Sequence, residues 1–352
     1  MTSAGVGNVP RMRAVMYSSL GDSSVLELVE RDQPTPHWGQ VRVRLAVAGV
    51  NPTDWKFRAG ATAAEMPFEE ISPGQDGAGV VDEVGNGVYG ITAGDRVWVF
   101  LAQHDRPLGT ATEYTVVPAE RVVPLGSASY DVGASLGVPA MTAHRALTVH
   151  EDGPDRLSPG ALDGRIVLVS GGAGAVGHAA IQLAAWSGAT VITTVSSDEK
   201  AALATSAGAH HVVNYRTGDA AAEIKAVAPD GVDLVVEVAI IQNADLVGQV
   251  LKRRGAVSIY ANTGGTDLNL PVRPFMALNA RLQFILLYTV GEDALRAAAE
   301  DVAAAAADGA LEVGEEHGLP LVRYPLEETA AAHDAVENGA VGKVLIDVAD
   351  VD

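Results

Sequence analysis

Residues 166–184 read IVLVSGGAGAVGHAAIQLA, an apolar strand and an apolar helix joined by a glycine-rich turn. Gly172, Gly174 and Gly177 form a G-x-G-x-x-G pattern directly between the two elements. In that context the glycines permit a tight turn, close approach of backbone to a pyrophosphate, and close packing of helix on strand. Amide groups at the start of the helix then face the phosphates. The stretch therefore predicts a dinucleotide-binding unit; the alternative is a glycine-rich turn that only packs.

The chain downstream repeats this strand–helix unit. From residue 165 onward, short apolar strands alternate with helical stretches, which is typical of a parallel sheet buried on both faces. The predicted strands are residues 166–170, 191–195, 211–214, 234–238, 257–260 and 282–287. A helix follows each of the first four, whereas loop residues lead from the fifth to the sixth. We therefore predict a doubly wound parallel sheet.

The chain upstream has the pattern of an antiparallel β domain. Apolar residues alternate with arginine or alanine along residues 41–47, which is the period of a half-buried strand. Further strands are predicted at 79–84, 96–101 and 113–117, separated by Gly, Asp and Pro turns. Residues 1–13, MTSAGVGNVPRMR, lack the apolar centre of a secretory signal and are interpreted as a loose lead-in.

Helical spacing over residues 131–150 marks the end of the β domain. An alanine-rich helix is predicted at 295–307, followed by a helix at 326–337 and a strand at 344–348. Because this tail resumes mixed structure, we expect it to return to the first domain. The predicted β domain is residues 1–138 with 308–352, and the predicted nucleotide-binding domain is residues 139–307.

Composition narrows the function classes. Hydrophobic residues make up 48% and charged residues 19% of the chain, which excludes a disordered protein. With 24 basic and 44 acidic residues the formal charge is −20, which repels nucleic acid and anionic membranes. The chain has no cysteine, so disulfides, thiol catalysis and cysteine-built zinc sites are excluded. We expect a cytoplasmic protein with a small-molecule substrate, no membrane span and no metal.

The end of the second parallel strand distinguishes the two nicotinamide cofactors. A carboxylate there accepts the ribose hydroxyls of NAD and repels the extra phosphate of NADP. Ser196 and Ser197 occupy this place, and Lys200 lies where a cation meets a 2′-phosphate. Asp198 is interpreted as the cap of a helix that starts at Glu199, with a ribose contact as the alternative. The pattern predicts NADPH.

At this point the chain resembles the quinone oxidoreductase (zeta-crystallin-like) branch of the medium-chain dehydrogenase/reductase superfamily. The resemblance covers nearly the whole chain and includes the glycine loop. Its other segments are AGVNPTDWKFRAG at 48–60, PGQDGAGVVDEVG at 73–85, AGDRV at 93–97, GVPAMTAHRAL at 137–147, SAGAHHVVNYR at 206–216 and YPLEETAAAHDAVENGAVGKVLI at 324–346.

The resemblance implies a GroES-like antiparallel β domain, a Rossmann nucleotide-binding domain and reduction of a quinone or an activated carbon–carbon double bond by NADPH. It also implies a homodimer, for which the apolar run 282–288 is a candidate edge strand; the alternative is a buried strand of the same sheet. The cofactor-binding residues that the motifs and the resemblance indicate are Asn51, Gly172, Ala173, Gly174, Ala175, Val176, Gly177, Ser196, Ser197, Lys200, Tyr215, Asn243, Tyr260, Ala261, Asn262, Phe284, Ile285, Leu286 and Lys343. Arg216 is a second candidate cation beside the 2′-phosphate.

The sequence departs from its relatives at the metal and proton-donor positions. Zinc-dependent members hold their metal with a cysteine and a G-H-E histidine, where this chain has Asn51 and the tripeptide 74–76, GQD. Lys56 replaces a tyrosine that lies beside the nicotinamide in close relatives. Thr62 stands where enoyl-thioester reductases carry a proton-donating tyrosine. Asn51, Lys56 and Thr62 are the candidate catalytic residues, although Asn51 is also suited to cap a helix before Asp54, and Lys56 to be a solvated helix residue.

These residues predict hydride transfer to an acceptor in a dry cleft, with Asn51 and backbone amides stabilising charge on oxygen and water supplying the proton. An enone or enoyl-thioester reductase remains an alternative within enzymes. A protein that binds NADPH without turnover is an alternative of another class, and a nucleic-acid-binding variant of it is disfavoured by the net charge of −20.

Overall fold

The computed structural model describes residues 10–62 and 64–351, which fold as two compact units. The first runs to Gly137 and also contains Val322–Ala340 and the chain from Val344 onward. The second comprises Val138–Leu321 and Val341–Lys343. Residues 308–321, predicted with the β domain, therefore belong to the second unit. Side chains of helix α4 (Ala175–Trp186) hold them there, because His178 and Gln182 bond the backbone carbonyls of His317 and Glu312.

The first unit is built on antiparallel strands. A two-stranded sheet pairs β1 (Arg11–Met16) with β2 (Glu27–Asp32). The larger sheet has the order β14 (Leu321–Pro325), β15 (Lys343–Asp347), β3 (Gln40–Val50), β4 (Asp76–Val84), β5 (Arg96–Val99) and β7 (Val122–Pro124), and β6 (Tyr114–Pro118) also pairs with β3. Its α-helices are α1 (Pro52–Arg58), α2 (Tyr130–Ser135) and α10 (Thr329–Glu337). Buried valines and leucines of β3, β4, β5 and β15 form its core.

The start of the described chain corrects one prediction. Residues 11–13, interpreted as part of a loose lead-in, begin strand β1, whereas residues 1–9 lie outside the described residues. The strand forms because Met12, Ala14 and Met16 alternate into a small apolar cluster, and an antiparallel ladder joins it to β2. The alternation covers only a few residues and follows directly on a segment with turn-forming residues, so the sequence analysis did not separate the two.

The second unit contains the predicted parallel sheet. Its strand order is β10 (His211–Asn214), β9 (Thr190–Val195), β8 (Ile166–Ser170), β11 (Val232–Glu237), β12 (Leu251–Ile259) and β13 (Arg281–Phe284), and every neighbouring pair is parallel. The order reverses direction between β8 and β11, the point at which doubly wound sheets bind their ligands. The predicted fold class is confirmed.

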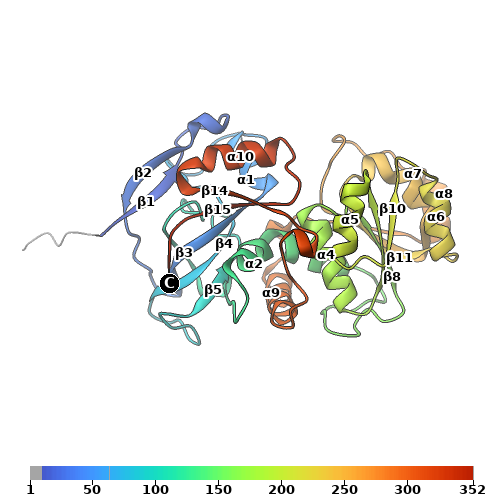
Figure 1. Ribbon diagram of the computed structural model, residues 1–352, viewed down its shortest axis with the longest axis horizontal. Coiled ribbons are helices and arrows are strands. Elements are labelled where there is room, and N and C mark those ends of the chain that lie inside the picture. The colour runs from blue at the N-terminus through green and yellow to red at the C-terminus, as the bar shows by residue number, and fades with distance from the viewer. Residues whose placement is uncertain (1–9, 63, 352) are drawn as a thin grey trace, which may run out of the picture. The chain divides into compact units, whose positions relative to one another are not determined.

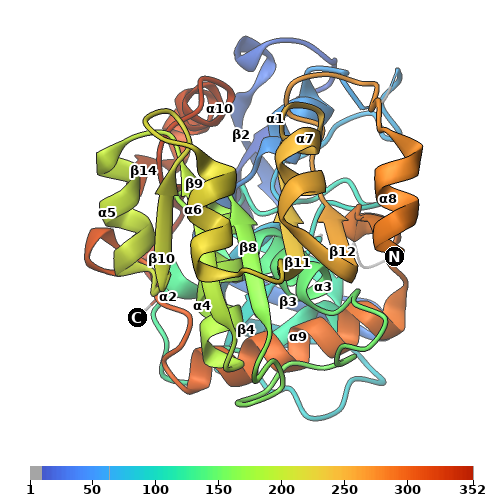
Figure 2. The ribbon, with the colours of Figure 1, turned by 90° about the vertical axis from the view of Figure 1, so that its right-hand side faces the viewer.

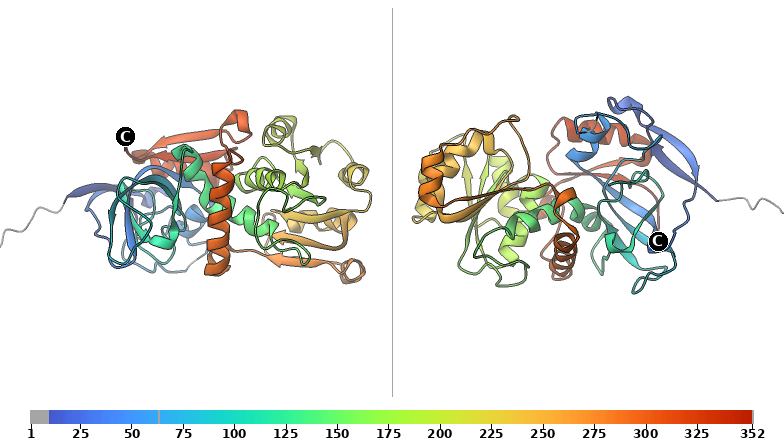
Figure 3. Two further views of the ribbon diagram at one scale, coloured as in Figure 1. Left: turned by 90° about the horizontal axis from the view of Figure 1, so that it is seen from below. Right: turned by 180° about the vertical axis from the view of Figure 1, so that it is seen from behind.

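Helices cover both faces of this sheet (Figures 1 and 2). On one face lie α4 and α5 (Asp198–Ser206), and on the other lie α6 (Ala220–Val227), α7 (Ile240–Val250) and α8 (Val272–Leu278). Helix α3 (Met141–Leu147) packs against α4 and against the long helix α9 (Glu292–Ala307), which Figure 3 shows lengthwise. No helix in the described part of the chain is long and apolar enough to cross a membrane.

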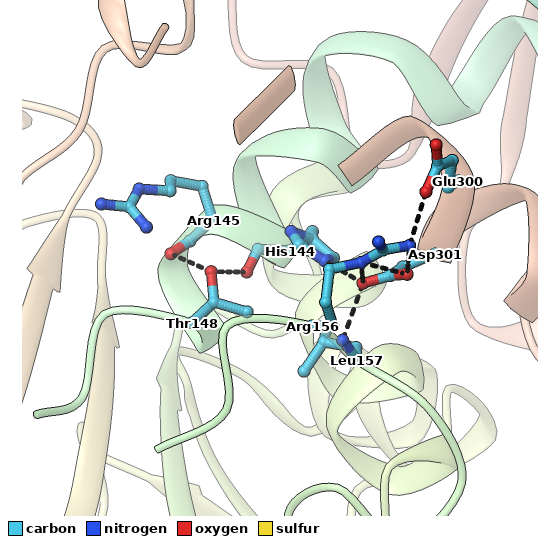
Figure 4. Close-up of polar contacts among 7 residues, drawn as sticks. All are labelled: His144, Arg145, Thr148, Arg156, Leu157, Glu300 and Asp301. Carbon is cyan, nitrogen blue, oxygen red and sulfur yellow. Dashed lines mark hydrogen bonds and ion pairs between the residues drawn. The ribbon is translucent and has the colours of Figure 1, made fainter. Parts of the chain in front are cut away.

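A polar cluster around the buried carboxylate of Asp301 connects α9 to α3 (Figure 4). Asp301 on α9 accepts hydrogen bonds from Arg156, from the backbone N–H of Leu157, and shares one with His144 Nε2 of α3 at 2.8 Å. Although burial raises the pKa of Asp301, these hydrogen bonds together lower it to about 2. The carboxylate thus ties two helices and one loop together.

Other element boundaries also differ from the sequence predictions. Residues 131–150 do not form one helix, because Pro139 lies within a π-helical turn, Leu136–Ala140, that separates α2 from α3. Helix α8 occupies part of the segment predicted as loop before the sixth strand. That strand, β13, ends at Phe284, and a 3₁₀ turn covers Leu287–Thr289.

Candidate active site

Two glycines of the glycine loop leave no space for a side chain. A Cβ on Gly172 would lie 2.2 Å from Thr193 Oγ1, and a Cβ on Gly177 would lie 2.3 Å from the carbonyl oxygen of Gly171. These two glycines therefore keep helix α4 close to the strands. A Cβ on Gly174 would have only the Gly171 oxygen nearby, at 3.5 Å, so this part of the loop is open. The loop thus fits a ligand that binds against its backbone.

Apart from Lys343, the predicted cofactor residues of the second unit lie at one edge of its sheet. Each follows the carboxyl end of a parallel strand: the loop residues Gly172, Ala173, Gly174, Ala175, Val176 and Gly177 after β8, Ser196, Ser197 and Lys200 after β9, Tyr215 after β10, Asn243 after β11, Tyr260, Ala261 and Asn262 after β12, and Phe284, Ile285 and Leu286 at the end of β13. Lys343 lies elsewhere: it is buried at the start of β15, and its backbone N–H donates to the carbonyl of Pro320.

The turn after β9 corrects the predicted helix start. Helix α5 begins at Asp198 rather than Glu199, and Ser197 is its cap, because Ser197 Oγ accepts the backbone N–H of Lys200. The Asp198 carboxylate instead accepts a hydrogen bond of 3.3 Å from Asn214. Ser196 is half-buried at the strand end, and Lys200 forms no ion pair within the described chain. A hydroxyl and a cation without an ion pair thus lie at the carboxyl end of β9, the place that the sequence analysis predicted for the extra phosphate of NADP.

A buried carboxylate that the sequence analysis did not propose lies between the glycine loop and α7. Glu237, the last residue of β11, accepts the hydroxyl of Ser170 at 2.7 Å, the N–H of Ala239 at 2.5 Å and the amide of Asn243 at 3.0 Å. It is fully buried. Burial together with the charge of Glu237 raises the pKa of the Tyr260 phenol. The signal was an acidic residue directly after the apolar run 234–236, at the carboxyl end of its strand.

A cavity of about 430 Å³ opens at the ends of β12 and β13. All six residues predicted after these strands line it: Tyr260, Ala261, Asn262, Phe284, Ile285 and Leu286. Its other lining residues are mainly aliphatic, including Ile240 and Leu268. The cavity is large enough for a ring system, and its walls are suited to a flat, largely apolar group.

In the first unit, Asn51 has a defined structural position. The pairing of Gly49 with Asp76 between β3 and β4 brings the following Asn51 close to Asp76, and Asn51 Nδ2 donates to Asp76 Oδ2 at 2.7 Å. Asn51 is also the N-cap of α1, and its backbone N–H donates to Asp54 Oδ2 at 2.7 Å. The helix-capping alternative is therefore realised in the structure. Asp76, which is fully buried, fixes the orientation of the Asn51 amide.

The other two candidate catalytic residues are more accessible. Lys56 is half-buried on α1, and its ammonium lies 5.9 Å from the centroid of the Trp55 ring. Thr62 is exposed in the bend that follows α1. The structure thus places Lys56 on α1 and Thr62 in the bend that follows this helix.

The positions that hold zinc in related dehydrogenases do not suit zinc here. Asn51 offers an amide, and Asp76 is engaged with that amide. Gln75 bonds Gln103 and accepts the N–H of His104. Across residues 10–62 and 64–351, no group of three or more His, Cys, Asp or Glu side chains is arranged to hold a metal ion. The donor set at these positions does not match the ligands that zinc prefers.

Comparison with protein families matches each unit. Residues 37–127 match the model of the alcohol dehydrogenase GroES-like domain, and residues 175–304 match the model of the zinc-binding dehydrogenase. The first match lies in the antiparallel unit and the second in the parallel-sheet unit. The two models together account for the predicted domain types.

Several characterised proteins are similar over almost the full chain. The quinone oxidoreductase of Rattus norvegicus is 31% identical over 345 residues, covering 95% of this chain and 97% of that enzyme. The 2-haloacrylate reductase of a Burkholderia species is 33% identical over 328 residues, covering 92% and 94%. The structure of Escherichia coli quinone oxidoreductase complexed with NADPH has a TM-score of 0.77 at 25% identity and covers 95% of this chain and 99% of that one.

Proposed function

Because the chain belongs to the quinone oxidoreductase branch of the medium-chain dehydrogenase/reductase superfamily, we propose that it reduces a quinone or an α,β-unsaturated carbonyl compound with NADPH and without zinc. The chain is an oxidoreductase of this superfamily and uses a nicotinamide cofactor. The observation that supports the proposal best is the carboxyl edge of the parallel sheet, where the open glycine loop, Ser196, Lys200 and the apolar cavity follow neighbouring strands.

The choice of NADPH rests on the turn after β9. Ser196 leaves room for a phosphate, and Lys200 supplies an unpaired positive charge. Asp198 is turned to Asn214 and lies in the first turn of α5. The structure of the E. coli relative contains NADPH, which supports the choice of the same cofactor for this chain.

The chain's own residues would bind, orient and shield the reactants. NADPH, when bound, supplies a hydride. Glu237 accepts hydrogen bonds from Ala239 and Asn243 and so holds the first turn of α7 in place. This turn lines the cavity, so that part of its wall is positioned before a ligand binds. We propose that Asn51, held by Asp76, binds the acceptor or the cofactor through its amide, and that Lys56 or Thr62 assists proton delivery from water.

The acceptor has two candidate classes, both consistent with the cavity. The rat relative is named for quinones, whereas the Burkholderia relative is named for 2-haloacrylate, an activated carbon–carbon double bond. We also propose a homodimer through β13, which is the last strand of the sheet and carries Phe284, 64% exposed. Sedimentation of the purified protein, with Phe284→Glu as the variant, tests this pairing.

Purified, metal-free protein should oxidise NADPH in the presence of a small quinone or a simple enone, and NADH much more slowly. The faster acceptor decides between the two classes. Oxidation of neither cofactor, with tight NADPH binding retained, would instead establish a binding protein. Loss of activity on metal removal, restored by zinc, would overturn the zinc-free part of the proposal.

Substitution of Ser196 tests the cofactor choice directly. Ser196→Asp puts a carboxylate at the end of β9, so we expect NADPH affinity to fall by at least about tenfold and NADH use to improve relative to NADPH. Fluorescence titration with each cofactor measures both changes. Ser158→Asp, an equal charge change on an exposed residue in the loop that leads to the amino end of β8, is the control. Unchanged NADPH affinity in Ser196→Asp would mean that the phosphate binds elsewhere.

A further inference from the structure

Two arginines converge on one backbone oxygen in the loop after β5. Arg106 Nη2 and Arg121 Nη1 both donate to the carbonyl of Leu101, at 2.6 and 2.8 Å. Arg106 Nε also donates to the carbonyl of Ala102 at 2.9 Å. Leu101 and Asp105 adopt left-handed backbone conformations, with φ of 49° and 57°. The two guanidinium groups therefore lie side by side, on a loop whose unusual backbone holds them there.

Neither guanidinium has an acidic partner among the described residues. Most other arginines of the first unit are paired: Arg13 with Glu113, for example, and Arg42 with Asp82. Arg106 and Arg121 form no ion pair within 4.0 Å, although the chain carries 44 acidic residues. Asp105 and Glu120 act on Arg106 only over a longer distance.

The positive charges of Arg106 and Arg121 are not balanced by an ion pair with any described residue, and they act on each other. Burial and the positive charge of Arg121 lower the pKa of Arg106 to about 10. Lowering of an arginine pKa means that its charged form is less stable than in water, so an anion placed between the two groups would restore that stability.

Donors remain available for such an anion. Arg106 Nη1 and Arg121 Nε and Nη2 have no hydrogen-bond partner in the described part of the chain. They are open to solvent, unlike Arg58 Nε, which is buried without a partner. Planar guanidinium groups with free N–H donors match carboxylate and phosphate oxygens. We propose that Arg106 and Arg121 form a binding site for a small oxoanion, either a carboxylate or a phosphate group.

The loop that carries this site is joined to the candidate active site of the same unit. The N–H of Ala102 donates to the carbonyl of Gln75, and the Gln75 amide bonds Gln103. Gln75 directly precedes Asp76, which holds Asn51. The oxoanion is therefore either an acidic group of the acceptor, which rests on the proposed function, or a free anion that binds independently of the reaction.

The first test is binding of inorganic phosphate to the full chain, saturated with NADP⁺ so that the glycine loop is occupied. At constant ionic strength, calorimetry should show saturable binding, weakened by roughly tenfold or more in the Arg106→Gln, Arg121→Gln double variant, because charge-assisted hydrogen bonds are lost. Arg296→Gln, which removes an exposed arginine of α9, should bind phosphate as the unaltered chain does. Equal affinity in the double variant, or no saturable binding to the unaltered chain, would overturn the proposal.

Because the two arginines also bind loop carbonyls, the double variant risks misfolding, and a second measurement uses the unaltered chain. Phenylglyoxal modifies accessible arginines, and mass spectrometry identifies them. Phosphate should slow modification of Arg106 and Arg121 severalfold and leave Arg296 unaffected. Equal protection of all three residues would contradict a specific site.

A kinetic comparison identifies the source of the anion. If the acceptor supplies it, the double variant should raise KM for an unsaturated acid by about tenfold, with little change for its methyl ester or for a neutral quinone. If both acceptors are unaffected while phosphate binding is lost, the site takes a free anion. Failure of the proposed function has a different signature, namely that the unaltered chain does not oxidise NADPH with the neutral quinone.

Discussion

The backbone of Gly137 packs directly against the carboxylate of Asp76. A Cβ on Gly137 would be 2.1 Å from Asp76 Oδ1, and Asp76 is held through its other oxygen by Asn51. Because Asp76 is short and fully buried, it has little room to move. The absence of a side chain at Gly137 is therefore a condition for the orientation of the Asn51 amide.

We expect Gly137→Ala to destabilise the fold by about 1–3 kcal/mol and to lower turnover with a quinone by roughly tenfold, because overpacking displaces Asp76. Thermal unfolding and steady-state kinetics measure the two effects. Gly248→Ala is the matched control, since its Cβ would meet only ring carbons of Phe275, the nearer at 3.6 Å. If both variants retain full activity, Asn51 does not depend on Asp76.

Residues such as Asp76 and Glu237 also show where prediction from sequence ends at this scale. The glycine loop and Ser196 were predicted because each directly follows a strand, and both belong to the unit β8–α4–β9, which the sequence pattern shows. Asp76 and Glu237 act through partners from other parts of the chain: Asn51, which follows β3, and Ser170, which ends β8. Those contacts appear only after the register of the strands is known.

Among the secondary-structure elements, strands made of a short apolar run were predicted with the correct bounds. Segments that mix apolar and charged residues were predicted less well. Strands β8 and β10 match their predicted bounds. Strand β12 starts at Leu251, earlier than predicted. The prediction missed its first half because Lys252, Arg253 and Arg254 follow one another there and give no apolar period. Helix α8 was missed because seven residues are too few to establish a helical period.

The hydrogen bonds that attach α9 to α3 and to the loop at 156–157 are made by one carboxylate, Asp301. We expect Asp301→Asn to destabilise the fold by about 3 kcal/mol, because an amide leaves Arg156 and His144 without their charged acceptor in a buried site. The melting temperature should then fall by roughly 6–10 °C. Differential scanning calorimetry measures this change.

Asp293→Asn is the control on the same helix. Asp293 is paired with Arg296, but its side chain is 94% exposed, so its loss should change the melting temperature very little. Similar effects of the two substitutions would show that the buried cluster in Figure 4 does not stabilise the attachment of α9.

The stability of the whole molecule should depend on pH through two buried histidines, one in each unit. Burial lowers the pKa of His178 to about 4, even though its hydrogen bond to the His317 carbonyl raises it. Burial and the charge of Arg58 lower the pKa of His333 to about 3. Both residues are therefore neutral in the folded chain at pH values where an unfolded histidine, with an ordinary pKa near 6.5, is already protonated.

Below pH 6.5 the unfolded chain thus binds more protons than the folded chain, so stability should fall as the pH decreases toward 4. Each histidine contributes about 3 kcal/mol to this loss at pH 4. His178→Asn removes one titrating group while keeping a donor for the His317 carbonyl, so it should reduce the slope of unfolding free energy against pH by about one proton between pH 6 and 4.5. Urea unfolding across this range measures the slope, and exposed His37→Asn should leave it unchanged. An unaltered slope in His178→Asn would show that the acid sensitivity arises from other groups.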